Sequence, residues 1–245
     1  MATNLLDPEI FAVNTVKPRI GQGDILMMKV WGSWSHDTQL PESDVDFVGC
    51  YVAHNREMLG LKRAPDTLTG EKPDYQVHEV GKFCELLIKG NPGIIEMLFT
   101  DKMIWSHKKW MPLVANRKEF LCETVVKQYL GYSQAQIKRL EAGMSVHSKG
   151  GKPGEKWAYH MYRVCLDAKR IAEGGEPKVW KDGEEKATLM DIRHGKIPPN
   201  EVVRMTKDVI ATIDSMAPWK LPKEADVAVL EDWLLWVRGL NVHAP

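Results

Sequence analysis

Two strand-like segments joined by a polar loop constrain the fold of this 245-residue chain more than any other feature. Residues 24–31 (DILMMKVW) form a short apolar run, which is typical of a buried β-strand. A loop of polar and turn-forming residues follows at 35–43, and residues 44–53 (DVDFVGCYVA) have the composition of a second strand. We therefore expect the two strands to pair antiparallel in a mixed sheet.

The rest of the chain changes from mixed to helical character near residue 105. Residues 54–73 are polar, contain glycine and proline, and are predicted to be a loop, whereas residues 74–78 have weak strand character. An amphipathic helix is predicted over residues 79–90, and a series of further helices follows beyond about residue 105. We predict an α/β (α+β) fold, with a small mixed-sheet core over residues 1–105 and a mainly α-helical part over residues 106–245.

Charge and cysteine content argue against several classes of protein. The chain carries 33 basic and 33 acidic residues, so its formal net charge of zero predicts no general attraction to nucleic acid. Its four cysteines form no CxxC pair, which argues against a zinc site or a disulfide framework and fits a reducing compartment. No segment reaches the roughly 20 apolar residues that cross a bilayer, and the N-terminal segment does not resemble a secretory signal. We expect a cytoplasmic protein without a membrane partner.

Asp44 and Asp46 are the first candidate site residues. Side chains alternate between the two faces of a strand, so both carboxylates are expected on one face, with Val45 and Phe47 facing the core. Two carboxylates this close repel each other unless a cation lies between them. Mg²⁺, or Mn²⁺ in its place, prefers oxygen ligands and commonly joins carboxylates to substrate phosphates. The alternative interpretation is a solvated pair of aspartates at an exposed strand edge.

Small and polar residues precede this pair at a suitable distance. Gly32 and Ser33 end the first strand, about ten residues before Ser43 and the two aspartates. A glycine lets the backbone approach a phosphate closely, and a serine offers both its hydroxyl and its amide. We predict that Gly32, Ser33 and Ser43 bind a nucleotide. Trp31 and Trp34 flank the Gly-Ser pair and are candidates for contact with a nucleobase.

The run GSWSHDTQLPESDVDFVG, from Gly32 to Gly49, resembles the signature of the DNA polymerase β-type nucleotidyltransferase superfamily. More narrowly, it resembles the predicted nucleotidyltransferases associated with RNA ligases. The likeness covers roughly residues 25–205 and includes EVGKFCELLIKGNPGIIEMLF at 79–99, EKWAYHMYRVCLDAKRIAEGGEPKVW at 155–180 and DIRHGK at 191–196. The chain departs from the pattern at Asp37, where the family often has glycine or another small residue.

The resemblance implies a third carboxylate on a later strand of the same sheet. Asp74 is the preferred candidate because it opens the strand predicted at 74–78. Glu79 is the alternative, although its place at the start of a helix also suits the positive end of the helix dipole. Asn91 and Glu96 match the family's Asn-Pro…Glu segment. Asn91 also suits a helix cap, and Glu96 suits a supporting hydrogen bond near the site.

The helix predicted from Glu155 to Glu173 carries further candidates. Lys156, His160 and Arg163 lie on one polar face of it, directly after a basic loop at 149–152. Such a face is either solvated or binds nucleotide phosphates, because lysine and arginine suit phosphate oxygens. Lys82, on the helix predicted over residues 79–90, has the same two interpretations.

The resemblance implies an enzyme that transfers a nucleoside monophosphate from a nucleoside triphosphate such as ATP to an acceptor hydroxyl and releases pyrophosphate. Mg²⁺ bound by Asp44, Asp46 and Asp74 is implied with it. The resemblance also points to RNA repair, with an RNA 3′ end as acceptor, and Lys108 and Lys109 could line a local groove for phosphates. Two alternatives remain open: AMP transfer to a protein side chain by the same site, and a non-catalytic module that binds nucleotide or RNA.

Overall fold

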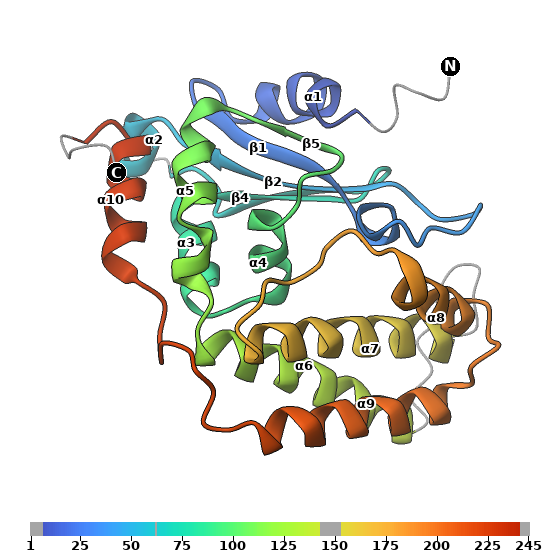
Figure 1. Cartoon of the computed structure of the whole chain (residues 1–245). Helices are drawn as coiled ribbons and strands as arrows, with labels where there is room; N and C mark the ends of the chain where they lie inside the picture. Colours follow the sequence, from blue (N-terminus) through green and yellow to red (C-terminus); the bar gives the residue numbers. More distant parts are fainter. Residues whose placement is uncertain (1–6, 62, 143–152, 241–245) are drawn as a thin grey trace.

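The structure is a computed structural model that describes residues 7–61, 63–142 and 153–240. It contains a mixed five-stranded sheet with the spatial order β3-β4-β2-β1-β5. Figure 1 labels β1, β2, β4 and β5 of this sheet. The strands are β1 (Asp24–Trp31), β2 (Asp46–Val52), β3 (Thr67–Gly70), β4 (Tyr75–Glu79) and β5 (Ile104–Ser106). This architecture confirms the predicted α+β class.

The other secondary-structure elements of the described chain are helices. The longer ones are α6 (Glu123–Glu141), α7 (Pro153–Ala172), α8 (Gly183–Arg193), α9 (Pro199–Ser215) and α10 (Val227–Val237). The shorter ones are α1 (Pro8–Phe11), η2 (Ala12–Val16), η3 (Lys17–Arg19), η4 (Gly32–His36), α2 (Asn55–Leu59), α3 (Val80–Ile88), α4 (Pro92–Leu98), η5 (Lys108–Trp110), α5 (Met111–Ala115) and η6 (Arg117–Phe120). None of these helices is both long enough and apolar enough to traverse a bilayer, as far as the described residues extend.

The strand pairing makes β2 the central strand of the sheet. β1 and β2 pair antiparallel, as predicted, with Trp31 opposite Asp46. β2 pairs parallel with β4, while β3 and β5 add antiparallel strands at the two edges. A parallel pair requires a crossover connection, and the segment between β2 and β4 supplies it with α2 and β3. Asp46, the first residue of β2, therefore lies between β1 and β4.

The two faces of the sheet pack against different helices. On one face, Phe47 and Tyr75 pack under the N-terminal turns, where Phe11 stacks on Phe47 with ring centroids 4.0 Å apart. The burial of Phe47 and the packing of Val45 in this cluster confirm their predicted direction. On the other face, Val48 belongs to the cluster that contains α3 and α4. Asp46 is two residues from Val48, so it faces this second, helix-covered side.

The helical part is continuous with the second face of the sheet. Phe83 of α3, Val126 of α6 and Val164 of α7 share one apolar cluster with Val48. Figure 1 shows α6, α7 and α9 side by side beneath the sheet, with α8 next to one end of α7. The end of β2 that carries Asp46 therefore opens toward α7 and α8.

Three short elements correct the secondary structure expected from the sequence. Residues 54–73 are not a simple loop, because they contain α2 and β3. The edge strands β3 and β5 have only four and three residues, and their backbone groups bond to β4 and β1 respectively. Pairing of this kind depends on neighbouring strands rather than on local sequence pattern. The second strand also begins at Asp46 rather than at Asp44.

Candidate active site

Asp46 and Asp74 lie side by side at one end of the sheet. Asp46 is the first residue of β2, and Asp74 immediately precedes β4. The parallel register pairs Phe47 with Tyr75, and the amide of Phe47 donates a hydrogen bond to the carbonyl of Asp74 at 2.9 Å. Each aspartate precedes its paired residue by one position, so the two are neighbours across the strands.

Asp44 joins these two residues without being part of the strand. It lies two residues before β2, so strand alternation does not position it as predicted. Burial raises the pKa of Asp46, repulsion from Asp74 and Asp44 raises it further, and Lys156 opposes the rise. The three carboxylates therefore form one electrostatically coupled group, whose charged state a cation would stabilise.

The donor chemistry of this group fits a hard cation. Carboxylate oxygens are the ligands that Mg²⁺ prefers, and a bound cation would relieve the repulsion that acts on Asp46. Within the described residues, however, no three His, Cys, Asp or Glu side chains converge closely enough to hold a metal ion. Binding one cation through all three carboxylates would thus require their side chains to rotate toward one another.

Glu79, the alternative third carboxylate, has a different environment. Its Oε2 accepts a hydrogen bond of 2.7 Å from the amide of Gly81 and so caps the N-terminus of α3. The same oxygen forms an ion pair with Arg238 at 3.0 Å. Glu79 is 5% exposed and does not line the pocket that contains Asp74. Its contacts are those of a structural residue.

A single pocket of about 580 Å³ contains most of the candidate residues. This volume lies within the range of pockets that bind small ligands. The predicted residues that line it are Gly32, Ser33, Ser43, Asp44, Asp46, Asp74, Lys156 and His160. The carboxylates come from the first residue of β2 and from the segments that precede β2 and β4, whereas Lys156 and His160 come from α7. The pocket is therefore built between the sheet and the helical part.

Gly32 is required where β1 turns into η4. Its φ of +67° lies in the left-handed region, and a Cβ at this position would approach Oδ2 of Asp46 to 3.0 Å. The loop that follows contains a second left-handed residue, Asp37, with φ of 56°. Aspartate tolerates this conformation better than most residues, and Lys186 holds the Asp37 carboxylate at 2.5 Å. Asp37 thus adopts the backbone conformation that a glycine would favour.

Arg193 is a pocket residue that the site prediction omitted. It donates to the carbonyl of Thr38 at 2.6 Å and to the hydroxyl of Ser43 at 3.4 Å. Its guanidinium also lies over the ring of Tyr159, 5.2 Å from the centroid. Arg193 belongs to the DIRHGK run, whose family resemblance could have identified it. It holds the loop between β1 and β2 against α7 and α8, and it also lines the pocket.

The polar face of α7 lies partly in the pocket and partly in the protein interior. Lys156 is exposed in the pocket, whereas burial, followed by Arg163, Lys156 and Arg193, lowers the pKa of His160 to about 3. His160 is therefore neutral at physiological pH and brings no positive charge to a phosphate. Arg163 does not line this pocket, because it forms a buried ion pair with Glu96 at 2.6 Å.

The other predicted cations and aromatic residues also lie in different places. Lys82 is outside the pocket and pairs with Glu85 at 3.1 Å. Trp31 and Asn91 line the pocket, whereas Trp34 does not; its Nε1 donates to the carbonyl of Ser43 at 3.3 Å. Asn91 caps α4 by accepting from the amide of Ile94 at 3.3 Å. Lys108 and Lys109 form η5 away from the pocket, and the basic loop at 149–152 lies outside the described residues.

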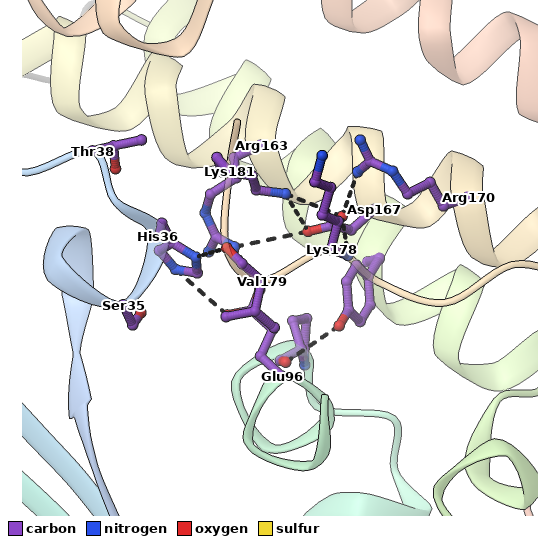
Figure 2. Close-up of polar contacts among 12 residues, drawn as sticks. Ser35, His36, Thr38, Glu96, Arg163, Asp167, Arg170, Lys178, Val179 and Lys181 are labelled. Carbon is purple, nitrogen blue, oxygen red and sulfur yellow. Dashed lines mark hydrogen bonds and ion pairs between the residues drawn. The ribbon is translucent and has the colours of Figure 1, made fainter. Parts of the chain in front are cut away.

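Figure 2 shows a buried ionic network whose residues do not line this pocket. Arg163 links Glu96 of α4 to Asp167 of α7, and Lys181 pairs with Asp167 at 3.1 Å. Asp167 and Lys181 are fully buried. Burial tends to lower the pKa of Arg163, but Glu96, Tyr159 and Asp167 outweigh it and raise the pKa, so this arginine stays charged.

His36 connects the loop after β1 to this network. Its Nδ1 lies 2.9 Å from the carbonyl of Val179, and its Nε2 lies 3.7 Å from Glu96. Burial and the nearby Arg163 hold the pKa of His36 well below its usual value, so the ring is neutral. The amide of Lys181 also donates to the carbonyl of His36 at 3.2 Å. These contacts attach the loop to the segment between α7 and α8 and place it beside α4.

Lys29 is a buried cation that the sequence analysis passed over inside the run DILMMKVW. It is fully buried in β1, and its Nζ has no hydrogen-bond partner among the described residues. The amine lies over the Trp31 ring, 5.0 Å from its centroid. Burial lowers the pKa of Lys29 to about 7, with Glu96, Arg163 and Asp101 as the charged groups that act on it.

The sequence of this chain matches a known protein family and is similar to a phage protein. A family model described as the RNA repair pathway DNA polymerase beta family matches residues 14–212. The chain is also similar to an uncharacterized 38.9 kDa protein in the nrdC-mobD intergenic region of Enterobacteria phage T4. The two are 26% identical over 192 residues, which cover 70% of this chain and 52% of that protein. The chain thus spans about half the length of this relative.

Proposed function

Since the chain belongs to the RNA repair pathway DNA polymerase beta family, we propose that its pocket transfers a nucleoside monophosphate from a nucleoside triphosphate to an acceptor hydroxyl. The observation that carries the proposal is the electrostatic coupling of Asp44, Asp46 and Asp74 at the start of β2. The pocket that contains them also contains Lys156 and Arg193. Carboxylates beside cations suit a reaction in which a metal-bound triphosphate is cleaved.

The reaction replaces one phosphoester bond with another. The acceptor oxygen forms a bond to the α-phosphorus while the bond from that phosphorus to the pyrophosphate oxygen breaks, and the hydroxyl proton passes to solvent. Asp44, Asp46 and Asp74 would hold Mg²⁺ or Mn²⁺, and the bound cation would supply charge that makes the hydroxyl more acidic and stabilises the departing pyrophosphate. Lys156 and Arg193 neutralise triphosphate oxygens, and Gly32 and Ser33 offer a close backbone approach to them.

RNA is the proposed acceptor, at a 3′ hydroxyl. The description of the family as one of an RNA repair pathway favours RNA over other hydroxyl-bearing molecules. AMP transfer to a protein side chain by the same site is the second candidate, because the carboxylates and cations would serve either hydroxyl. A non-catalytic role is disfavoured, since three coupled carboxylates are costly to maintain without a cation to bind.

Labelling distinguishes these acceptors. The protein is incubated with each of the four α-³²P-labelled nucleoside triphosphates, Mg²⁺, and either total RNA or total protein. We expect label in RNA that ribonuclease removes and protease does not. Label that only protease removes would support protein modification instead. Absence of label from both fractions, with every nucleotide and with Mn²⁺ in place of Mg²⁺, would refute the proposal.

A further inference from the structure

The floor of the pocket continues along β4, away from the carboxylates. Tyr75 and Val77 face the opposite side of the sheet, where they are buried. Alternation therefore puts Gln76 and His78 on the same face as Asp74, and both line the pocket. His78 is four positions after Asp74, which corresponds to about 13 Å, whereas Gln76 is two positions after it, or about 7 Å. In this polar strip of Gln76 and His78, His78 is therefore too far from the carboxylates to take part in the transfer step, and Gln76 lies between His78 and Asp74.

The orientation of His78 is fixed from the edge strand. Its Nδ1 lies 2.9 Å from the hydroxyl of Thr67 on β3, and among the described residues no hydrogen bond occupies Nε2. Because the two ring nitrogens lie on opposite sides of the imidazole, Nε2 is directed away from β3. Burial and the nearby Lys82 lower the pKa of His78, so the ring is neutral at pH 7. A neutral imidazole and the Gln76 amide recognise a ligand by hydrogen bonds rather than by charge.

Apolar side chains complete this part of the pocket. Leu86 of α3 and Met97 of α4 line it together with Val48 of β2. The combination of apolar walls with an amide and an imidazole suits a flat, hydrogen-bonding heterocycle. A triphosphate would find no cation among these five pocket residues.

Sheet order separates this strip from the cations of the pocket. β1 lies on one side of β2, and the loop that follows β1 is fastened to α7 and α8, which carry Lys156 and Arg193. β4 lies on the other side of β2. In phosphoryl transfer, the attacking and leaving oxygens lie roughly in line on opposite sides of the phosphorus. If pyrophosphate leaves toward Lys156 and Arg193, the acceptor approaches from the side of β4.

Lys82 adds a cation at the far end of the strip. It lies outside the pocket but close enough to His78 to lower its pKa. Its partner Glu85 is more than half exposed, so this ion pair is weak and open to competition. Lys82 is therefore available to a backbone phosphate of a chain whose end occupies the strip.

We propose that Gln76 and His78 bind the nucleobase of the terminal nucleotide of the acceptor, between the walls formed by Leu86 and Met97. This inference rests on the proposed function, and it specifies a nucleic-acid end with an intact base rather than a protein hydroxyl. The pocket then holds the two substrates on opposite sides of Asp46.

Binding without turnover tests the inference. The affinity of the full chain for a fluorescein-labelled single-stranded RNA hexamer is measured by anisotropy, in the absence of nucleotide. Replacing both side chains, Gln76→Leu with His78→Phe, is expected to weaken binding about tenfold, which corresponds to about 1.4 kcal/mol. The affinity for a nonhydrolysable nucleoside triphosphate with Mg²⁺ is expected to stay the same. Gln128→Leu, on the exposed surface of α6, is the matched control.

An RNA whose 3′-terminal nucleotide lacks its base sharpens the test. The parent protein should bind this RNA as weakly as the double variant binds the intact one, and the double variant should not distinguish the two. Unchanged affinity of the double variant for the intact hexamer, or no binding of RNA by the parent, would overturn the inference. Weakened nucleotide binding would overturn it as well, by assigning the strip to the donor.

These outcomes are independent of the transfer reaction. Base-dependent RNA binding in a protein that releases no pyrophosphate would retain the binding site and reject the proposed function. Pyrophosphate release with RNA binding that ignores the terminal base would retain the function and reject the binding site.

Discussion

At the scale of single residues, the strand register shows which of two candidate carboxylates lies in the site, whereas the sequence left both open. Asp74 and Glu79 are five residues apart, and both border a predicted element. The register brings Asp74 beside Asp46, while the amide of Gly81 and the side chain of Arg238 engage Glu79. Which carboxylate joins Asp44 and Asp46 depends on the end of β4 at which it lies, and this is a property of the sheet.

Substituting these two residues should therefore have opposite effects. Asp74→Asn is expected to reduce nucleotidyl transfer at least about a hundredfold, since a metal ligand is worth several kcal/mol in the transition state. Its melting temperature should match that of the parent. Glu79→Gln is expected to keep most of the activity but to lose about 1–3 kcal/mol of stability, because a cap and a largely buried ion pair are weakened. The reverse pattern would identify Glu79 as the ligand.

Lys29 makes a prediction about the pH dependence of stability. In the unfolded chain its amine stays protonated up to about pH 10.5, whereas in the folded protein it loses its proton near pH 7. Between these values the unfolded state binds more protons, so the free energy of unfolding rises with pH, by up to about 1.4 kcal/mol per unit. This contribution is complete above pH 10.5 and is lost as the pH falls to 7.

Comparison with Lys29→Met isolates this effect from other titrating groups. Urea unfolding of both proteins is measured from pH 7 to pH 9.5. We expect the parent to gain stability relative to the variant as the pH rises. A difference between the two proteins that stays constant over this range would show that Lys29 keeps its proton in the folded state.

At the scale of elements, segments with a clear apolar pattern of their own were predictable. Segments that form only through contacts with neighbouring elements were not. β1 and α3 match the runs DILMMKVW and EVGKFCELLIKG closely, because β1 is a continuous apolar run and α3 buries side chains at helical spacing. β5 has three residues and exists through its pairing with β1. The same reason explains Arg163: its helix was predicted, but its burial depends on Glu96 from α4.

The loop between β1 and β2 is the element on which the site depends most. Arg193 holds it through two hydrogen bonds from one guanidinium, to Thr38 and Ser43. Lysine keeps the charge but not this planar fork. Arg193→Lys is expected to raise the KM for nucleoside triphosphate about tenfold, with a smaller change in kcat. Arg204→Lys, exposed on α9, serves as the control, and an unchanged KM in Arg193→Lys would argue that Arg193 acts only through its charge.

At the scale of the whole molecule, the pocket exists only because the sheet and the helical part are held together. The boundary predicted near residue 105 passes through one shared apolar cluster, in which Val48 and Val164 both take part. The buried network from Glu96 to Lys181 also crosses it, and His36 joins the network from the loop. The overall class followed from sequence pattern, whereas these long-range ion pairs link segments that no local pattern connects.

Breaking the network should destabilise the entire protein. Asp167→Asn leaves the fully buried Lys181 with a weakened set of counter-charges, and we expect a loss of about 3–5 kcal/mol of stability. Asp208→Asn, at an exposed pair with Arg204, should change stability by less than about 1 kcal/mol. Both values are measured by urea unfolding. Similar values for the two variants would mean that the network contributes no more than a surface ion pair.

Pyrophosphate release by the parent protein and by Asp46→Asn tests the central claim most directly. With Mg²⁺, RNA and a nucleoside triphosphate, the parent should release pyrophosphate, and Asp46→Asn should do so at least about a hundredfold more slowly. The variant should melt at or above the temperature of the metal-free parent, because it removes a carboxylate that its neighbours repel. Equal rates in the two proteins, or no release by the parent with any of the four nucleotides in Mg²⁺ or Mn²⁺, would contradict the account.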